Sequence, residues 1–156
     1  MPKSVRKKGE VIPMAEKKPN PIIEFLKQVE LCDRNITNKL EELSHLKSMI
    51  LKVTATWKQD VTSGGTDSQD KLGEAVAKIV DLENEINREI DSFIDKTREV
   101  SAVIQQVKDP DQLAVLHKRY FLYHTWEQIA CDMNMSYRNV CYIHGKALQA
   151  VEELMK

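Results

Sequence analysis

The chain has 156 residues, about the length of one domain with an appendage, and 30% of them are charged but only 6% aromatic. Five glycines and five prolines leave few turns, so we expect few, long elements. A β-sandwich, a barrel or a doubly wound α/β domain is excluded because each needs many more chain breaks. No apolar run is long enough to span a membrane, and three widely spaced cysteines indicate a reducing, cytoplasmic location.

The N-terminal segment differs from the rest of the chain in its charge. Residues 1–20 carry six basic and two acidic side chains together with several prolines, whereas the net charge of the whole chain is −1. This composition predicts a disordered basic tail. The tail either contacts phosphate groups or serves solubility alone, and both alternatives remain open.

Two heptad-like apolar patterns predict a long helical hairpin over residues 21–108. In both, apolar residues recur at alternating steps of four and three, as in the seam of a coiled coil. Polar residues interrupt the register at Asp33, Lys47 and Thr54 in the first pattern and at Glu83 and Thr97 in the second. The first pattern comprises Ile22, Leu26, Val29, Ile36, Leu40, Leu43, Ile50 and Trp57, and the second comprises Leu72, Val76, Ile79, Ile86, Ile90, Phe93, Val100, Ile104 and Val107. A connection near residues 58–70 contains two adjacent glycines, so the helices should fold back on each other as an antiparallel coiled coil.

The predicted seam is narrow and leaves further apolar side chains partly exposed. Among these are Ile23, Phe25, Val80, Leu82 and Ile94. Covering them requires a second protein surface, so we expect a homo-oligomer, a dimer, formed through the hairpin. An isolated stalk in a monomeric protein is the alternative.

Residues 109–156 predict a compact module of three short helices. The first follows the proline that ends the second long helix. Thr125 and Gln128 have the spacing of a capping box, which opens the second helix. Asn134 tolerates the left-handed backbone of a tight turn, and Ser136 caps the third helix. The contact positions of a helix-turn-helix are then filled by Ile129, Ala130, Met133, Met135, Val140 and Ile143. The alternative is an ordinary helical hairpin that buries some of the same residues.

The third helix of the module has one apolar and one polar face. Its polar face carries no acid before Glu152, and arginine and asparagine can read guanine and adenine. We therefore expect contact with double-stranded DNA, against the alternative of an ordinary solvated surface. The expected base contacts are Arg138, Asn139 and Tyr142, and the expected phosphate contacts are Ser136, Tyr137, Lys146 and the amide end at Thr125 and Trp126.

The segments from Tyr120 to Ala130 and from Ser136 to Leu148 resemble a family of small phage and prophage proteins from low-GC Gram-positive bacteria. Their C-terminal module is similar to region 4 of sigma-70 factors, and the ArpU- and RinA-type late-gene regulators look related. The resemblance covers about residues 22–155. It implies a sequence-specific transcriptional regulator of phage or prophage genes in the bacterial cytoplasm, with RNA polymerase as a candidate second partner.

The base-reading positions depart from the sigma pattern. Principal sigma factors have Arg, Glu and Arg where this chain has Tyr137, Arg138 and Cys141. Specificity for the −35 promoter element therefore cannot be carried over. The chain also has no counterpart of the region that binds the −10 element, so it is not a complete sigma factor.

Two further functions remain as alternatives. A small terminase subunit for DNA packaging also pairs a helix-turn-helix with a coiled coil, although its DNA-binding module usually comes first. A protein-interaction module without DNA binding is the other alternative. We expect no enzyme, no cofactor and no metal site, because the sequence contains no phosphate-binding glycine loop, no closely spaced cysteine pair and no set of nucleophile, base and orienting group.

Overall fold

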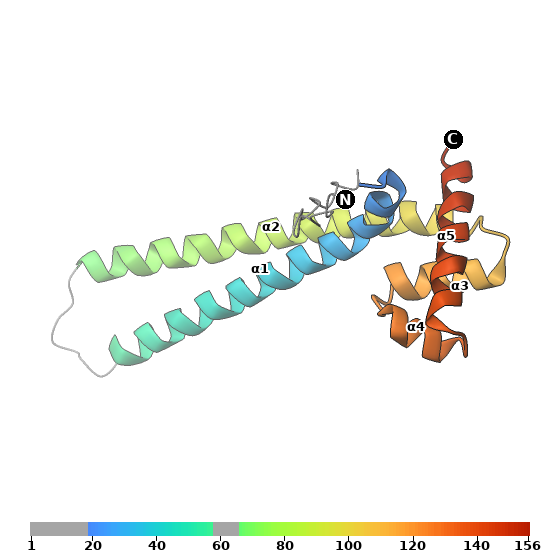
Figure 1. Cartoon of the computed structure of the whole chain (residues 1–156). Helices are drawn as coiled ribbons and strands as arrows, with labels where there is room; N and C mark the ends of the chain where they lie inside the picture. Colours follow the sequence, from blue (N-terminus) through green and yellow to red (C-terminus); the bar gives the residue numbers. More distant parts are fainter. Residues whose placement is uncertain (1–18, 58–65) are drawn as a thin grey trace, which may run out of the picture.

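The computed structural model describes residues 19–57 and 66–156, which form five α-helices. The two long helices, α1 (Pro21–Trp57) and α2 (Thr66–Ile104), lie side by side as an antiparallel hairpin. The short helices α3 (Pro110–Tyr120), α4 (Trp126–Asp132) and α5 (Tyr137–Leu154) follow as a compact module at one end of the hairpin (Figure 1). The predicted all-α class, with a long helical hairpin followed by smaller helices, is confirmed.

Parts of two predicted segments lie outside the described residues. They are positions 1–18 of the expected basic tail and positions 58–65 of the expected connection. The remainder of that connection differs from the prediction, because α2 already begins at Thr66.

The seam between α1 and α2 is apolar at the end near the module. Its buried side chains are Ile22, Leu26, Val29, Cys32 and Ile36 from α1 and Leu82, Ile86, Val100 and Ile104 from α2. Three residues assigned to the seam by the heptad pattern are instead exposed, namely Leu40, Val76 and Ile90. Conversely, Leu82 was expected to be partly exposed and is buried.

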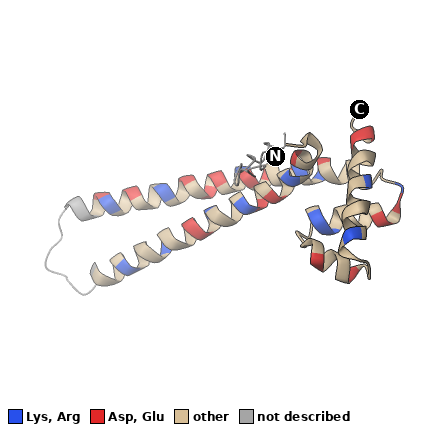
Figure 2. Ribbon diagram, in the orientation of Figure 1, with Lys and Arg blue, Asp and Glu red and all other residues tan. Residues whose placement is uncertain are grey.

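A lysine in the seam explains why Leu40 is exposed. The Lys39 ammonium lies 2.9 Å from Glu85 and 3.1 Å from Glu89 of α2, and its side chain is only 22% exposed. Lys39 thereby takes the inward position that the pattern gave to its neighbour Leu40. Ion pairs between the helices continue toward the distal end, where Lys47 lies 2.6 Å from Glu83, and both signs of charge are spread along the hairpin (Figure 2).

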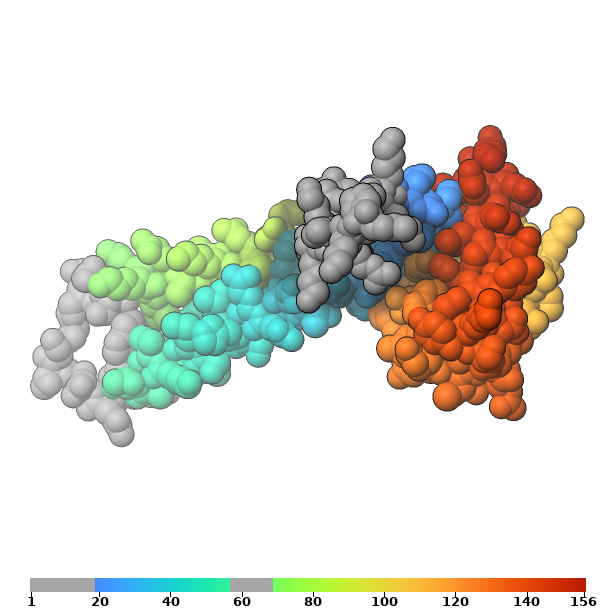
Figure 3. Space-filling model, viewed as in Figure 1, coloured from blue at the N-terminus to red at the C-terminus, as the bar shows by residue number. Residues whose placement is uncertain are grey.

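One apolar cluster joins the hairpin to the module. It contains Leu26 and Val29 of α1, Val100 and Ile104 of α2, Leu116 and Tyr120 of α3, and Ala147 and Val151 of α5. The module is therefore packed against the base of the hairpin rather than suspended from it (Figure 3).

A tyrosine in the α3–α4 loop adds a second connection to the hairpin. Tyr123 has a left-handed backbone with a φ of 55°. Burial, followed by the carboxylate of Asp33 on α1, raises the pKa of its phenol to about 12.

Among the described helices none is long and apolar enough to cross a bilayer.

We expect Leu116→Ala to lower the free energy of unfolding by about 2–5 kcal/mol, because it opens a cavity in the cluster that joins hairpin and module. Leu116 has no exposed surface. Leu31→Ala is the matched control, since Leu31 is 59% exposed on α1. Urea unfolding followed by circular dichroism measures both. Equal losses for the two variants would contradict the importance of this cluster.

Candidate nucleic-acid interface

Helices α4 and α5 meet over a small apolar core of their own. Val115 of α3, Ile129 and Ala130 of α4 and Val140 of α5 are buried together. Around them pack the partly buried side chains of Trp126, Met133, Met135 and Ile143. All six residues that the sequence assigned to helix-turn-helix contacts therefore belong to this core or pack against it.

The turn between α4 and α5 has the conformation expected from its asparagine. Asn134 has a φ of 56°, in the left-handed region. Its N–H donates to the carbonyl of Cys131 at 3.2 Å, and the N–H of Met135 donates to that of Ala130 at 2.9 Å. At the start of α5 the hydroxyl oxygen of Ser136 accepts from the N–H of Asn139 at 3.2 Å, so the predicted cap is confirmed.

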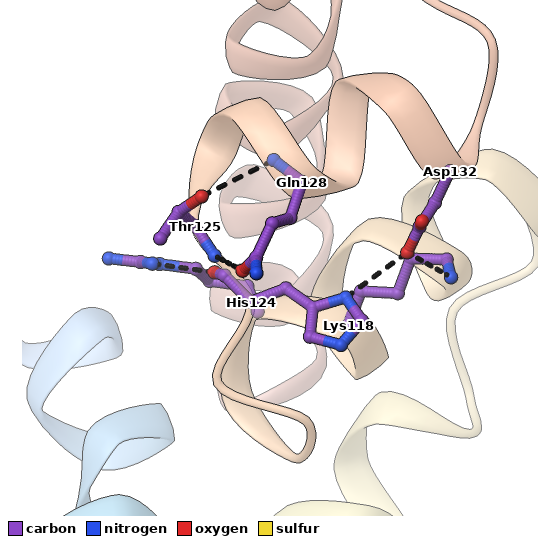
Figure 4. A network of polar contacts seen from close by, with 6 residues as sticks. Lys118, His124, Thr125, Gln128 and Asp132 are labelled. Atoms are coloured by element: carbon purple, nitrogen blue, oxygen red, sulfur yellow. Dashed lines mark hydrogen bonds and ion pairs between the residues drawn. The ribbon is translucent and has the colours of Figure 1, made fainter.

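The predicted capping box at the start of α4 is also present (Figure 4). The N–H of Gln128 donates to the Thr125 hydroxyl oxygen at 3.3 Å, and the N–H of Thr125 donates to the Gln128 side-chain oxygen at 2.8 Å. These two amides are thereby used within the chain. Of the expected phosphate-binding amide end, the amides of Trp126 and Glu127, which lie between these two, remain.

The N-terminal half of α5 presents an exposed polar surface. Tyr137 is 51% and Tyr142 64% exposed, and Arg138, Asn139 and Lys146 are exposed as well. The helix lies along the outside of the module (Figure 3). With 3.6 residues per turn, Arg138 and Tyr142 lie opposite the buried Val140. The predicted base-reading residues therefore share one accessible surface.

A pair of carboxylates lies beside part of this surface. Asp109 and Asp111, at the start of α3, line a shallow hollow together with Tyr142 and Lys146. Asp109 is fixed there because its carboxylate accepts the N–H groups of Asp111 and Gln112, at 2.9 and 3.1 Å. These negative charges would repel a phosphate group placed near Lys146. The first two turns of α5 are therefore the part of the helix best suited to contact nucleic acid. No local sequence pattern indicates this pair of carboxylates beside α5, because only folding brings the two segments together.

Trp126 is partly buried, and its indole ring packs within the module. The guanidinium of Arg119 lies 4.5 Å from the centre of the indole ring, and the ring of His144 lies 4.6 Å away on an edge-to-face contact. The indole thus anchors α4 to α3 and α5. Its expected contact with a phosphate is limited to the backbone amide.

Tyr120, which is buried, and His144, which is partly buried, form a polar pair next to this tryptophan. The Tyr120 hydroxyl lies 2.9 Å from Nε2 of His144. Burial, with a smaller contribution from Arg119, lowers the pKa of His144 to about 4, and burial raises the pKa of Tyr120 to about 12. Both side chains are therefore neutral at pH 7. No sequence pattern marked them, since their role depends on tertiary packing.

A second polar network holds the end of α4 against α3. The carboxylate of Asp132 lies 3.1 Å from the Lys118 ammonium and 3.2 Å from Nδ1 of His124 (Figure 4). Lys118, and then His124, lower the pKa of Asp132.

Within residues 19–57 and 66–156, no group of three or more histidine, cysteine, aspartate or glutamate side chains is arranged to hold a metal ion.

The model of a protein family described as "Protein of unknown function (DUF1492)" matches residues 50–154. This range is more than half of the chain. The chain belongs to the DUF1492 family. The matched range includes α2, α3, α4 and α5. Neither a curated protein nor a solved structure matches the chain.

We expect the free energy of unfolding of this DUF1492 protein to fall as the pH is lowered from 6.5 toward 4. Folded His144 stays neutral over this range, because its pKa is lowered from 6.5 to about 4. The unfolded chain takes up the proton near its ordinary pKa, so protonation favours unfolding.

Urea unfolding at several pH values measures this effect. His144→Gln should lose part of the pH dependence, because the glutamine does not titrate. His45→Gln is the control, since His45 is exposed on α1. An unchanged pH dependence in His144→Gln would show that this histidine does not carry the effect.

Proposed function

We propose that this DUF1492 protein binds DNA in a sequence-specific manner and regulates the transcription of phage or prophage genes. The observation that carries the proposal is the division of α5 into two faces. Val140, Ala147 and Val151 are buried, whereas Arg138, Asn139 and Tyr142 are exposed before the first acidic side chain of the helix. A helix-turn-helix uses its second helix in this way.

The arrangement suits insertion of the first turns of α5 into the major groove. There Arg138 can donate two hydrogen bonds to a guanine and Asn139 can bind an adenine. Tyr142 lies on the same surface and is suited to a base contact, whereas Tyr137 is suited to a contact with the sugar-phosphate backbone. Cys141, beside Tyr137, raises the pKa of that phenol, and the hydroxyl of Tyr137 can donate to a phosphate oxygen.

The sequence resemblance supports the biological setting of the proposal. It relates the module to region 4 of sigma-70 factors and the chain to ArpU- and RinA-type late-gene regulators. On this basis the protein acts in the bacterial cytoplasm, with RNA polymerase as a second partner. Specificity for the −35 element is not part of the proposal, because Tyr137 and Cys141 replace the arginines of principal sigma factors.

We expect Arg138→Ala to reduce the ratio between the affinity for the best DNA site and the affinity for the other duplexes by about tenfold or more. The reason is that the loss of one bidentate base contact costs about 1–3 kcal/mol. Fluorescence anisotropy with overlapping duplexes from the DNA flanking the gene measures the preference at two salt concentrations. Affinity for all duplexes should fall with added salt, because phosphate contacts release counterions.

Arg98→Ala is the matched control, since it removes the same charge from the surface of the hairpin, where the side chain is 79% exposed. It should leave the preference unchanged. The proposal is wrong if no duplex is preferred under any condition, or if Arg98→Ala and Arg138→Ala weaken binding equally.

A further inference from the structure

The side chain of Asn139 has a defined contact with the turn that precedes α5. Its amide nitrogen Nδ2 donates to the sulfur of Met135 at 3.4 Å. The two residues are four positions apart, and helical side chains lean back toward the N-terminus of their helix, which brings this amide over the turn. The orientation of the amide is therefore set by a residue that lies outside the helix.

Met135 is itself held in place by the turn and by the core of the module. Its N–H donates to the carbonyl of Ala130 at 2.9 Å. Its side chain is partly buried and packs against the cluster that contains Ile129 and Val140. A thioether sulfur is a weak acceptor of hydrogen bonds and cannot donate them. The sulfur therefore favours the orientation in which the amide nitrogen of Asn139, rather than the amide oxygen, faces the turn.

The amide oxygen of Asn139 is left for a partner outside the chain. The backbone N–H of Asn139 donates to the Ser136 hydroxyl oxygen at 3.2 Å, and among the residues that the structure describes none donates to Oδ1 of Asn139. The side chain is exposed, like those of Arg138 and Tyr142. Its outward edge offers the oxygen as an acceptor and the second N–H of the amide as a donor.

We infer that Met135 is a positioning residue that makes Asn139 selective for adenine at one position of the DNA site. In the major groove adenine presents a donor at N6 and an acceptor at N7, which match the oxygen and the second N–H of the amide. Guanine presents acceptors at both places, so its O6 would meet the amide oxygen without a proton between them. The inference deepens the proposed function and rests on it, because it concerns the same surface of α5.

Single base-pair changes in the best duplex, followed by fluorescence anisotropy, test the inference. The pair read by Asn139 is the A·T pair whose replacement by G·C weakens binding of the wild type but not of Asn139→Ala. Replacing its adenine by purine, which lacks the N6 amino group, should have the same two effects.

At this pair Met135→Leu should lower the ratio of the affinities for A·T and G·C by about three- to tenfold, the range that one net hydrogen bond spans. Leucine keeps a similar volume but offers no acceptor, so the core should be preserved. The preference for guanine at the pair read by Arg138 should stay unchanged, because the contact with Met135 orients only the amide of Asn139.

Met133→Leu is the matched control, because Met133 is partly buried against the same core but the amide of Asn139 is bonded to Met135. It should leave both preferences unchanged. Equal effects of Met133→Leu and Met135→Leu would overturn the inference, and so would an equal loss of the adenine and guanine preferences in Met135→Leu, since either result is that of packing alone.

The same measurements separate failure of the inference from failure of the proposed function. If Asn139→Ala keeps the preference at every A·T pair while Arg138→Ala loses the preference for guanine, the inference is wrong and the proposed function stands. If the wild type prefers no duplex, the proposed function is wrong and the inference falls with it.

Discussion

Burial of apolar surface at the base of the hairpin is the interaction on which the rest of the structure depends. Three parts of the chain that are distant in sequence meet there, represented by Leu26, Val100 and Leu116, which are almost completely buried. Val151 of α5 enters the same cluster. Because one core serves both the hairpin and the module, the orientation of α5 is fixed relative to the long helices, and a surface on α5 is presented on a rigid support.

The double role of α5 follows from this constraint. Its inner face packs into two apolar clusters, one through Val140 and the other through Ala147 and Val151. Rotation of the helix about its axis would remove these side chains from both clusters. Rotation is further opposed by the contact of Tyr120 with His144. The outer face is then left with arginine, asparagine and tyrosine, which are residue types that read base edges and hold phosphates.

Local signals in the sequence were sufficient to predict the helices of the module and their ends. The Thr125 capping box, the Ser136 cap and the left-handed Asn134 each depend on residues within three or four positions, so they can be recognised without the fold. The long hairpin was predictable for the same reason, since heptad spacing is a local pattern.

Features that depend on the partner helix could not be predicted in this way. A heptad pattern does not decide between two neighbouring flanks of one helix, and the glutamates of α2 determine that Lys39 rather than Leu40 turns inward. The packing of Trp126 between Arg119 and His144 likewise joins three helices. The acidic pair beside Lys146 comes from the start of α3, more than thirty residues earlier in the chain.

The central claim is that the first two turns of α5 form the surface that contacts DNA. Hydrogen–deuterium exchange of the full chain, with and without a short duplex at low ionic strength, tests it most directly. The account predicts slower exchange at the start of α5 and in the turn before it, with little change along the hairpin. Slower exchange confined to the hairpin, or no change in α5 with the duplex bound, would contradict it.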